Sequence, residues 1–335
     1  MPDLPDLVRA LLNPRAYPEP PARVELVQTQ ISYVFLAGDL VYKVKKPVDM
    51  GFLDYSTLEK RFTLCHKEVE LNRRLCPDAY LGVVTVTLEK GAYKIDGQGK
   101  PLEYAVKMRR LPTESMMDVL LARDKVTPEM VGRVAQKIAD FHGRAATGEE
   151  IVRLGGLEAV IKNTEENFDQ TEKYFDVIIT PQTFEHIRDY THGFIRENRP
   201  LFKRRAAGGR IRDCHGDLHA AHVCFCDNLC IYDCIEFIDR LRYTDVTADV
   251  AFLAMDLDHY GRADLAGVFV ETYVGTSGDK ELLKLLNFYK CYRAYVRGKV
   301  GCFQYDDPLI SPEDKGRIIA AARSYFELAE SYIKT

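Results

Sequence analysis

The pattern of apolar residues changes near residues 111–112, and this change limits the folds that are open to the chain. Before this point, short apolar runs are separated by turn signals at residues 38–39 and 96–99, which predict β-hairpins. One long helix is expected from Thr57 until proline stops it at Pro77. Beyond residue 112, apolar residues recur mainly at helical spacing. We therefore expect an α+β fold, with a mostly antiparallel β lobe that contains one long helix and then a mostly helical lobe.

The length of 335 residues exceeds the usual size of a single domain, so two lobes are expected. We expect a loosely packed arm over residues 1–23, a first lobe over 24–110 and a second lobe over 111–335. The first lobe should run β, β, α, β, β, β. In the second lobe, strand character returns only at residues 223–236. Four helical segments should follow, at residues 246–257, 265–273, 282–300 and 317–333.

Composition excludes several classes of protein. No stretch approaches the roughly 18 uncharged apolar residues of a membrane-spanning helix, and the acidic, proline-containing N-terminus does not resemble a secretory signal. We therefore expect a soluble, cytoplasmic protein without a membrane partner. The net charge of −4 suggests no nucleic-acid partner. Nine cysteines at irregular spacing predict reduced thiols, mostly acting as small buried hydrophobic residues.

The densest group of reactive side chains lies in the segment from Cys214 to His222, Cys-His-Gly-Asp-Leu-His-Ala-Ala-His. Asp217 is at its centre, and Asp233 follows the next short apolar run. Two carboxylates on adjacent loops suit phosphoryl transfer, because one can orient an attacking hydroxyl while the other holds a metal ion on the phosphates.

The sequence His215-Gly-Asp217-Leu-His resembles the catalytic loop of aminoglycoside phosphotransferases and choline-kinase-like enzymes, which have a protein-kinase-like fold. The resemblance implies that Asp217 is the catalytic carboxylate and that Asp233 binds metal. Asp249, in Thr-Ala-Asp-Val, is similar to an aspartate that supports the catalytic loop from below in that family. Glu236 is a reserve metal ligand.

The first lobe carries the same resemblance. Val-Tyr-Lys43-Val is similar to the strand that presents a lysine to the α- and β-phosphates of ATP, and Glu68 is similar to the helical glutamate that holds this lysine. Lys45 and Glu70 are the rivals, since alternation along a strand places both lysines on one face. Ser32 is the only plausible small polar contact for the phosphates in the glycine-poor hairpin. ATP would bind between the lobes, where Asp217 and Asp233 should converge near Lys43.

His222 occupies the position at which the family has an asparagine that binds metal. Mg²⁺ prefers oxygen ligands, whereas imidazole suits Mn²⁺ or Zn²⁺ better, so the cofactors implied are ATP and a divalent metal, Mg²⁺ or Mn²⁺, with Mn²⁺ preferred. The implied activity is that of a small-molecule kinase, which is an ATP-dependent phosphotransferase acting on a hydroxyl of a small-molecule acceptor.

The resemblance is closest to the kinase-like half of bacterial proteins that often carry an added P-loop ATPase domain. The sequence contains no G-x-x-x-x-G-K-[ST] motif, so this second module is expected to be absent and a separate P-loop ATPase becomes a candidate partner.

Two other functions compete with this interpretation. His222 and the glycine-poor hairpin also fit a catalytically silent nucleotide-binding or interaction module, a pseudokinase. The histidines of the 214–222 segment, together with Asp217, could instead bind a catalytic metal in a hydrolase. His142 is expected to be a packed histidine, and the basic residues Lys290, Arg293 and Arg297 are expected to form a solvated helix face.

Overall fold

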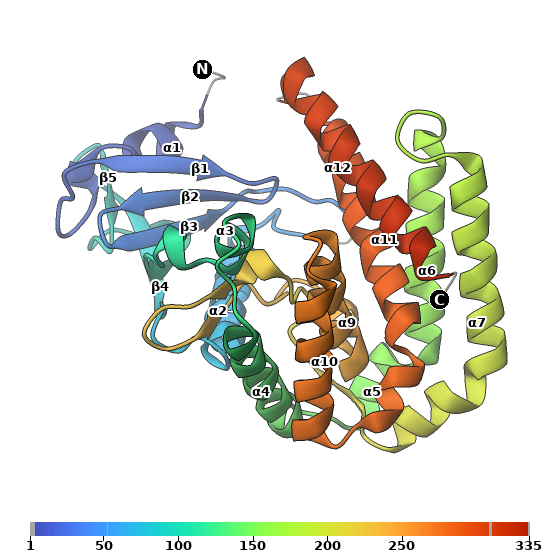
Figure 1. Ribbon diagram of the computed structural model, residues 1–335. Coiled ribbons are helices and arrows are strands. Elements are labelled where there is room, and N and C mark those ends of the chain that lie inside the picture. The colour runs from blue at the N-terminus through green and yellow to red at the C-terminus, as the bar shows by residue number, and fades with distance from the viewer. Residues whose placement is uncertain (1–3, 52, 308–309, 334–335) are drawn as a thin grey trace. The chain divides into compact units, whose positions relative to one another are not determined.

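The computed structural model describes residues 4–51, 53–307 and 310–333 and divides into two compact units (Figure 1). The first unit comprises Met1–Met116 together with His222–Ile238, and the second comprises Met117–Ala221 with Asp239–Thr335. The first is built around a sheet and the second is mainly helical, which confirms the predicted α+β class. The segment His222–Ile238 therefore belongs with the N-terminal sheet, although it follows more than a hundred residues of the second unit.

The first unit contains a six-stranded antiparallel sheet. Its strand order is β1-β2-β3-β6-β4-β5, so β6 lies between β3 and β4. Three strands precede the long helix, where the sequence predicted two. The strands are β1 (Val24–Gln28), β2 (Ser32–Ala37), β3 (Leu40–Lys45), β4 (Tyr80–Glu89), β5 (Ala92–Ile95) and β6 (Pro101–Arg109).

The two predicted turns have different outcomes. Gly38, with φ of +65°, joins the paired strands β2 and β3, as expected for a tight hairpin. The turn signal at residues 96–99 leads from β5 to β6, but these strands are not neighbours in the sheet, so the prediction of a hairpin there is wrong. The hairpin is instead formed by β4 and β5 through Lys90 and Gly91. The sequence signal marked a turn correctly, but it does not state which strands pair.

The long helix α2 (Leu58–Arg73) forms where the sequence predicted it. The side chain of Thr57 caps its first turn by accepting a hydrogen bond from the backbone N–H of Lys60 at 3.2 Å. The helix packs on β4 and β6, and its buried face includes Cys65, Glu68 and Val69. A fixed helix on this face of the sheet places Glu68 beneath β3.

The N-terminal segment is packed more closely than the expected loose arm, of which residues 1–3 lie outside the described residues. Residues 6–11 form the short helix α1 (Asp6–Leu11), followed by a turn of 3₁₀-helix at Pro14–Ala16. Val8 and Leu11 are almost fully buried with the sheet residue Phe35. Tyr17 donates a hydrogen bond from its hydroxyl to the carbonyl of Leu11 at 2.8 Å. The apolar spacing in this segment therefore belongs to the core of the first unit.

The second unit is built from helices that pack around α9 (Val246–His259), which is buried along almost its whole length. The four C-terminal helical segments that the sequence predicted correspond to α9, α10, α11 and α12. Two short strands, β7 (Ile211–Asp213) and β10 (Tyr243–Asp245), pair antiparallel on either side of the candidate catalytic loop, and the sequence did not predict them. The remaining helices are α3 (Met117–Ala122), α4 (Pro128–Arg144), α5 (Glu149–Gly155), α6 (Leu157–Thr171), α7 (Pro181–Ala207), α8 (Asp239–Arg242), α10 (Ala263–Ser277), α11 (Leu286–Tyr305) and α12 (Pro312–Ser331).

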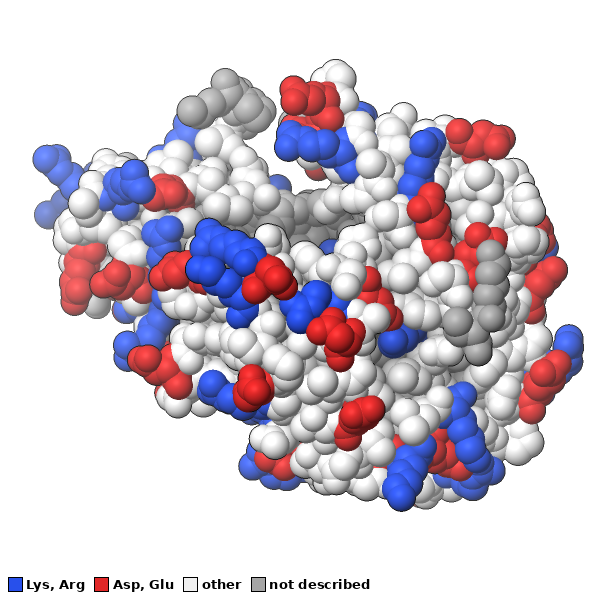
Figure 2. Space-filling model, in the orientation of Figure 1, with Lys and Arg blue, Asp and Glu red and all other residues white. Residues whose placement is uncertain are grey.

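Within the described ranges, none of the helices combines the length and the hydrophobicity needed to cross a bilayer. On the face drawn in Figure 2, acidic and basic side chains are interspersed rather than gathered into areas of one sign. Exposed ion pairs of this kind each contribute roughly 0–1 kcal/mol to stability. The stability of both units therefore comes mainly from their buried cores.

Candidate active site

Lys43 and Lys45 reach the same glutamate from strand β3. Nζ of Lys43 lies 3.0 Å from Oε1 of Glu68, and Nζ of Lys45 lies 2.6 Å from Oε2. Lys43 also donates a hydrogen bond to Oδ1 of Asp233 at 2.6 Å. The predicted Lys43–Glu68 pair is therefore present, but Lys45 shares it. Glu70, the alternative glutamate, is exposed on the opposite side of α2.

The two lysines differ in their access to solvent. The side chain of Lys45 is 1% exposed, whereas those of Lys43 and Asp233 are 16% and 39% exposed. Lys45 is further bonded to Glu236 and to the hydroxyl of Tyr55. Glu236, proposed above as a reserve metal ligand, is therefore occupied as the buried partner of Lys45. Lys43 is the lysine that a ligand can approach, and Lys45 is a structural cation behind it.

Opposite charges determine the ionisation of this cluster. Burial alone would lower the pKa of Lys43, but the negative charges of Asp233, Glu68 and Glu236 outweigh it and hold the pKa well above its ordinary value. Burial would raise the pKa of Glu68, but Lys43 and Lys45 lower it overall. Lys43 and Glu68 are consequently charged near neutral pH.

Asp233 takes an uncommon backbone conformation at the candidate metal site. Its φ is +63°, in the left-handed region that aspartate tolerates better than most residues. Its backbone N–H donates to the hydroxyl of Tyr80 at 3.3 Å. Nε2 of His222 lies 3.5 Å from Oδ2 of Asp233. The first unit thus brings together both predicted metal ligands, with two donor atoms close enough to share one ion.

Ser32, the predicted phosphate contact, lies at the start of β2 and pairs in register with Lys45. Its side chain is fully buried, and among the described residues its Oγ has no hydrogen-bond partner. A buried hydroxyl without a partner costs stability, so an unpaired one is a candidate for a ligand contact. Its role as a phosphate contact stays a prediction.

Asp249, at the start of α9, supports the loop that contains Asp217, as the resemblance implied. Oδ2 of Asp249 accepts a hydrogen bond from the backbone N–H of His215 at 2.7 Å, and Oδ1 accepts one from Gly216 at 2.9 Å. Nε2 of His142 lies 3.3 Å from Oδ2 of Asp249. Burial would raise the pKa of Asp249, but the hydrogen bond from His142 and the nearby positive charges lower it to about 2.

Asp217 itself is partly exposed at the end of this anchored turn. Its carboxylate Oδ2 lies 3.7 Å from Nε2 of His219, and its backbone N–H donates to Nδ1 of His215 at 3.2 Å. His215 is fully buried and uses Nδ1 within the loop, which argues against it as a metal ligand through that atom. Asp217 belongs to the second unit and Asp233 to the first, so the convergence of these carboxylates stays a prediction.

Sequence reasoning missed a second carboxylate that supports the loop. Oδ2 of Asp256 accepts a hydrogen bond from the backbone N–H of Ala220 at 2.8 Å, and Oδ1 lies 3.3 Å from the hydroxyl of Tyr325. Asp256 is seven residues after Asp249, which places both on one face of α9. That spacing is the signal that could have identified it.

The prediction that Lys290, Arg293 and Arg297 form a solvated face of α11 is wrong. Arg293 is buried, donates from Nε to the carbonyl of Ala248 at 3.1 Å and lies over the ring of Phe252. Lys290 donates to Asp258 at 2.8 Å. The physical reason is that α11 packs on α9 and α12, which the spacing of basic residues alone does not reveal. His142, by contrast, is packed as expected, with Nδ1 at 2.9 Å from the hydroxyl of Tyr273.

Comparison with known proteins gives the family. Residues 56–285 match the phosphotransferase enzyme family, and this range includes Glu68, Asp217 and Asp233. The chain belongs to this family. The resemblance inferred from the catalytic loop is therefore confirmed.

Relatives of this chain occur in mycobacteria. Uncharacterised proteins of Mycobacterium tuberculosis and Mycobacterium bovis are 34% identical to it over 283 residues, which cover 84% of this chain and 55% of theirs. The chain thus spans about half the length of the curated relatives it matches.

Solved structures share the fold. A choline/ethanolamine kinase family protein from Mesorhizobium loti is 14% identical, with a TM-score of 0.52 over 93% of this chain and 92% of its own. A proposed aminoglycoside phosphotransferase from Ralstonia eutropha is 12% identical, with a TM-score of 0.56 over the same shares of the two chains. At these identities the likeness establishes the kinase-like fold of the chain and nothing about its substrate.

Proposed function

We propose that the protein is a small-molecule kinase that transfers the γ-phosphate of ATP to a hydroxyl group of its acceptor. The observation that carries this proposal is the ion-pair arrangement of Lys43, in which one partly exposed cation contacts Glu68 at 3.0 Å and Asp233 at 2.6 Å. Family membership supports the same chemistry.

The residues of the first unit fit a metal–nucleotide. Lys43 offers a positive charge to phosphate oxygens, and Glu68 holds it in position from α2. Asp233 and His222 offer one oxygen and one nitrogen to a divalent ion. The orphaned hydroxyl of Ser32 is a further donor for an anionic group. Bound ATP and its metal would supply the transferable phosphoryl group and neutralise the charge that develops on it.

Asp217 performs the remaining task in this proposal. A partly exposed carboxylate on a loop fixed by Asp249 and Asp256 can accept a hydrogen bond from the acceptor hydroxyl, orient it and take up its proton. Asp249 and Asp256 fix the loop through its backbone N–H groups and not through the side chain of Asp217. We place this activity in the cytoplasm, where ATP is abundant. A separate P-loop ATPase partner stays a prediction of the resemblance.

The test is a phosphate-transfer screen with the purified protein. ATP labelled in its γ-phosphate is incubated with Mg²⁺ or Mn²⁺ and with pooled amino sugars, amino alcohols, nucleosides and sugars, with Asp217→Asn as the control. We expect label to appear in one pool and to be lost in the variant. Nucleotide binding without transfer to any pool, under both metals, would favour the pseudokinase and overturn the proposal.

A further inference from the structure

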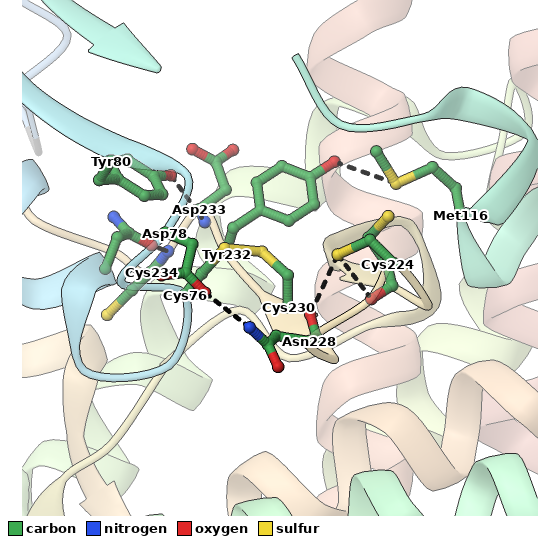
Figure 3. The surroundings of a disulfide bond; sticks show 12 residues. Cys76, Asp78, Tyr80, Met116, Cys224, Asn228, Cys230, Tyr232, Asp233 and Cys234 are labelled. Atoms are coloured by element: carbon green, nitrogen blue, oxygen red, sulfur yellow. Dashed lines mark hydrogen bonds between the residues drawn. A yellow bond between two sulfur atoms is a disulfide. The ribbon is translucent and has the colours of Figure 1, made fainter. Parts of the chain in front are cut away.

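A disulfide bond joins two distant parts of the first unit, contrary to the prediction of reduced thiols. Cys76 follows the end of α2 by three residues, and Cys230 lies in the short strand β9 (Cys230–Ile231) (Figure 3). Their Cα atoms are 4.7 Å apart, although 154 positions separate them in the sequence. The sequence spacing could not reveal the bond, because the two cysteines meet only when His222–Ile238 returns to the first unit.

Each cysteine of this disulfide lies close in the sequence to a carboxylate that contacts Lys43. Glu68 lies in α2, eight residues before Cys76, and Asp233 lies three residues after Cys230. Lys43 bonds to both carboxylates. The disulfide therefore connects covalently the two segments whose alignment defines the proposed nucleotide site.

The Cys230 segment is also held by ion pairs of Asp233 with Lys43 and of Glu236 with Lys45, and by a few backbone hydrogen bonds. Among the described residues, strand β9 pairs with β8 (Val223–Cys224) over two residues on each side and lies outside the six-stranded sheet. Beyond it, the backbone N–H of Cys234 donates to Oδ1 of Asn72 at 2.8 Å. The backbone N–H of Asp233 donates to the hydroxyl of Tyr80 (Figure 3). These hydrogen bonds can hold the native position, but each contributes only about 0.5–1.5 kcal/mol net.

We propose that the Cys76–Cys230 disulfide is a reversible redox site, and that its oxidation aligns Glu68 and Asp233 for nucleotide binding. The effect on nucleotide binding rests on the function proposed above. Disulfides are rare in the reducing cytoplasm, and those that occur there are usually transient or redox-sensing rather than structural. The Cys76–Cys230 bond joins the two segments that present Glu68 and Asp233 to Lys43. In a cytoplasmic kinase, such a bond fits the redox-sensing disulfides better than the structural ones.

The chemical step is thiol–disulfide exchange with a dithiol reductant. A thiolate of the reductant attacks one sulfur and forms a mixed disulfide, while the other cysteine leaves as a thiolate and takes up a proton. The second thiol of the reductant then displaces the remaining cysteine, which is likewise protonated. Two electrons and two protons pass to the protein, and the reductant becomes a disulfide. A disulfide oxidant reverses the reaction.

Two buried thiols near this pair are poor competitors for the exchange. Cys224 is opposite Cys230 in the β8–β9 register, but burial raises the pKa of Cys224 to about 12. Burial likewise raises the pKa of Cys65, in the same apolar cluster, to about 12. Because the thiolate is the attacking species, both thiols are poor nucleophiles near neutral pH. Exchange with the disulfide is therefore not expected to pass through Cys224 or Cys65.

The first experiment compares the oxidised protein with protein reduced by dithiothreitol. Hydrogen exchange of backbone amides is followed in residues 68–76 and 229–236. We expect faster exchange in both segments after reduction, and the double variant Cys76→Ser/Cys230→Ser should match the reduced protein with and without dithiothreitol. Cys226→Ser is the matched control, since Cys226 lies in the same hairpin outside the disulfide and should leave the response intact. Unchanged exchange on reduction would overturn the redox site.

The second experiment measures the affinity of a non-hydrolysable ATP analogue with Mn²⁺ for the same proteins. We expect reduction, or the double variant, to weaken binding by on the order of tenfold. Without the disulfide, the segments of Glu68 and Asp233 become ordered only when the ligand binds, and this ordering lowers the affinity. Equal affinity in both redox states would overturn the proposed alignment. Absence of analogue binding in both states would refute the proposed function instead, and the exchange experiment, which needs no nucleotide, would still decide the redox site.

Discussion

The Lys43 cluster and the Asp217 loop use carboxylates in different ways. In the first, Glu68 and Asp233 contact the side chains of lysines. In the second, Asp249 and Asp256 accept hydrogen bonds from backbone N–H groups of the loop. Side-chain ion pairs can exchange one partner for a ligand, whereas a carboxylate bonded to backbone fixes the path of the chain. The first region is thus suited to receive a charged ligand, and the second to hold one side chain in place.

The largest expected effect tests whether the fixed loop holds Asp217 as the catalytic base. Asp217→Asn should lower kcat by about 10²–10⁴-fold, because a positioned general base contributes about that much. Its free energy of unfolding, measured with urea, should be nearly unchanged, since Asp249 still holds the loop. The exposed Asp227→Asn removes an equal charge from a turn and serves as the control. An unchanged kcat in Asp217→Asn would show that Asp217 is not the catalytic base.

A second pair of variants separates the two lysines of β3. Lys45→Met should lower the free energy of unfolding by about 3–5 kcal/mol, because it leaves Glu68 and Glu236 buried with too little compensating charge. Lys43→Met should destabilise less and should mainly raise the KM for ATP or lower kcat. Chemical denaturation and steady-state kinetics measure the two effects. Equal losses of stability would show that both lysines are structural.

The pH dependence of stability tests the carboxylate beneath the loop. The pKa of Asp249 is lowered from 3.8 to about 2 in the folded protein, so its ionised form contributes stability above pH 4 that is lost as the pH falls towards 2. The shift corresponds to about 2 kcal/mol. Asp249→Asn should therefore show a smaller fall in unfolding free energy than the parent between pH 4 and pH 2. Parallel curves for the two proteins would contradict the assignment.

The smallest expected effect concerns the metal. The parent should prefer Mn²⁺ over Mg²⁺ because His222 offers a nitrogen ligand beside Asp233. His222→Asn should restore the use of Mg²⁺, with a change in the ratio of kcat/KM for the two metals on the order of tenfold, or about 1.4 kcal/mol. Equal rates with both metals in the parent would exclude His222 as the determinant.

Local signals in the sequence were sufficient for much of the fold. Thr57 and Pro77 delimited α2, and Gly38 marked the first hairpin, because capping and turn formation depend on residues close in sequence. The same principle explains the catalytic loop, whose motif is contiguous. The family comparison confirmed the resemblance that followed from it.

Contacts between distant residues were beyond the reach of the sequence. The pairing of β6 with both β3 and β4, the disulfide of Cys76 and the support of Ala220 by Asp256 all join segments that no local pattern links. The preference for Lys43 over Lys45 came from the resemblance, because alternation places both lysines on one face and only their burial separates them. Burial depends on the packed structure rather than on the spacing of residues.

The first unit is assembled from two separate stretches of the chain, and this has a consequence for its folding during synthesis. Its sheet is complete once residue 109 has been made, but Asp233 and the partner of Cys76 are encoded far downstream, in His222–Ile238. At about 5–20 residues per second, a ribosome needs on the order of ten seconds to translate the intervening chain. During that interval the nascent sheet carries Lys43 and Lys45 without Asp233 or Glu236, and Cys76 is still a thiol. An N-terminal fragment ending at Met116 would remain in this incomplete state permanently.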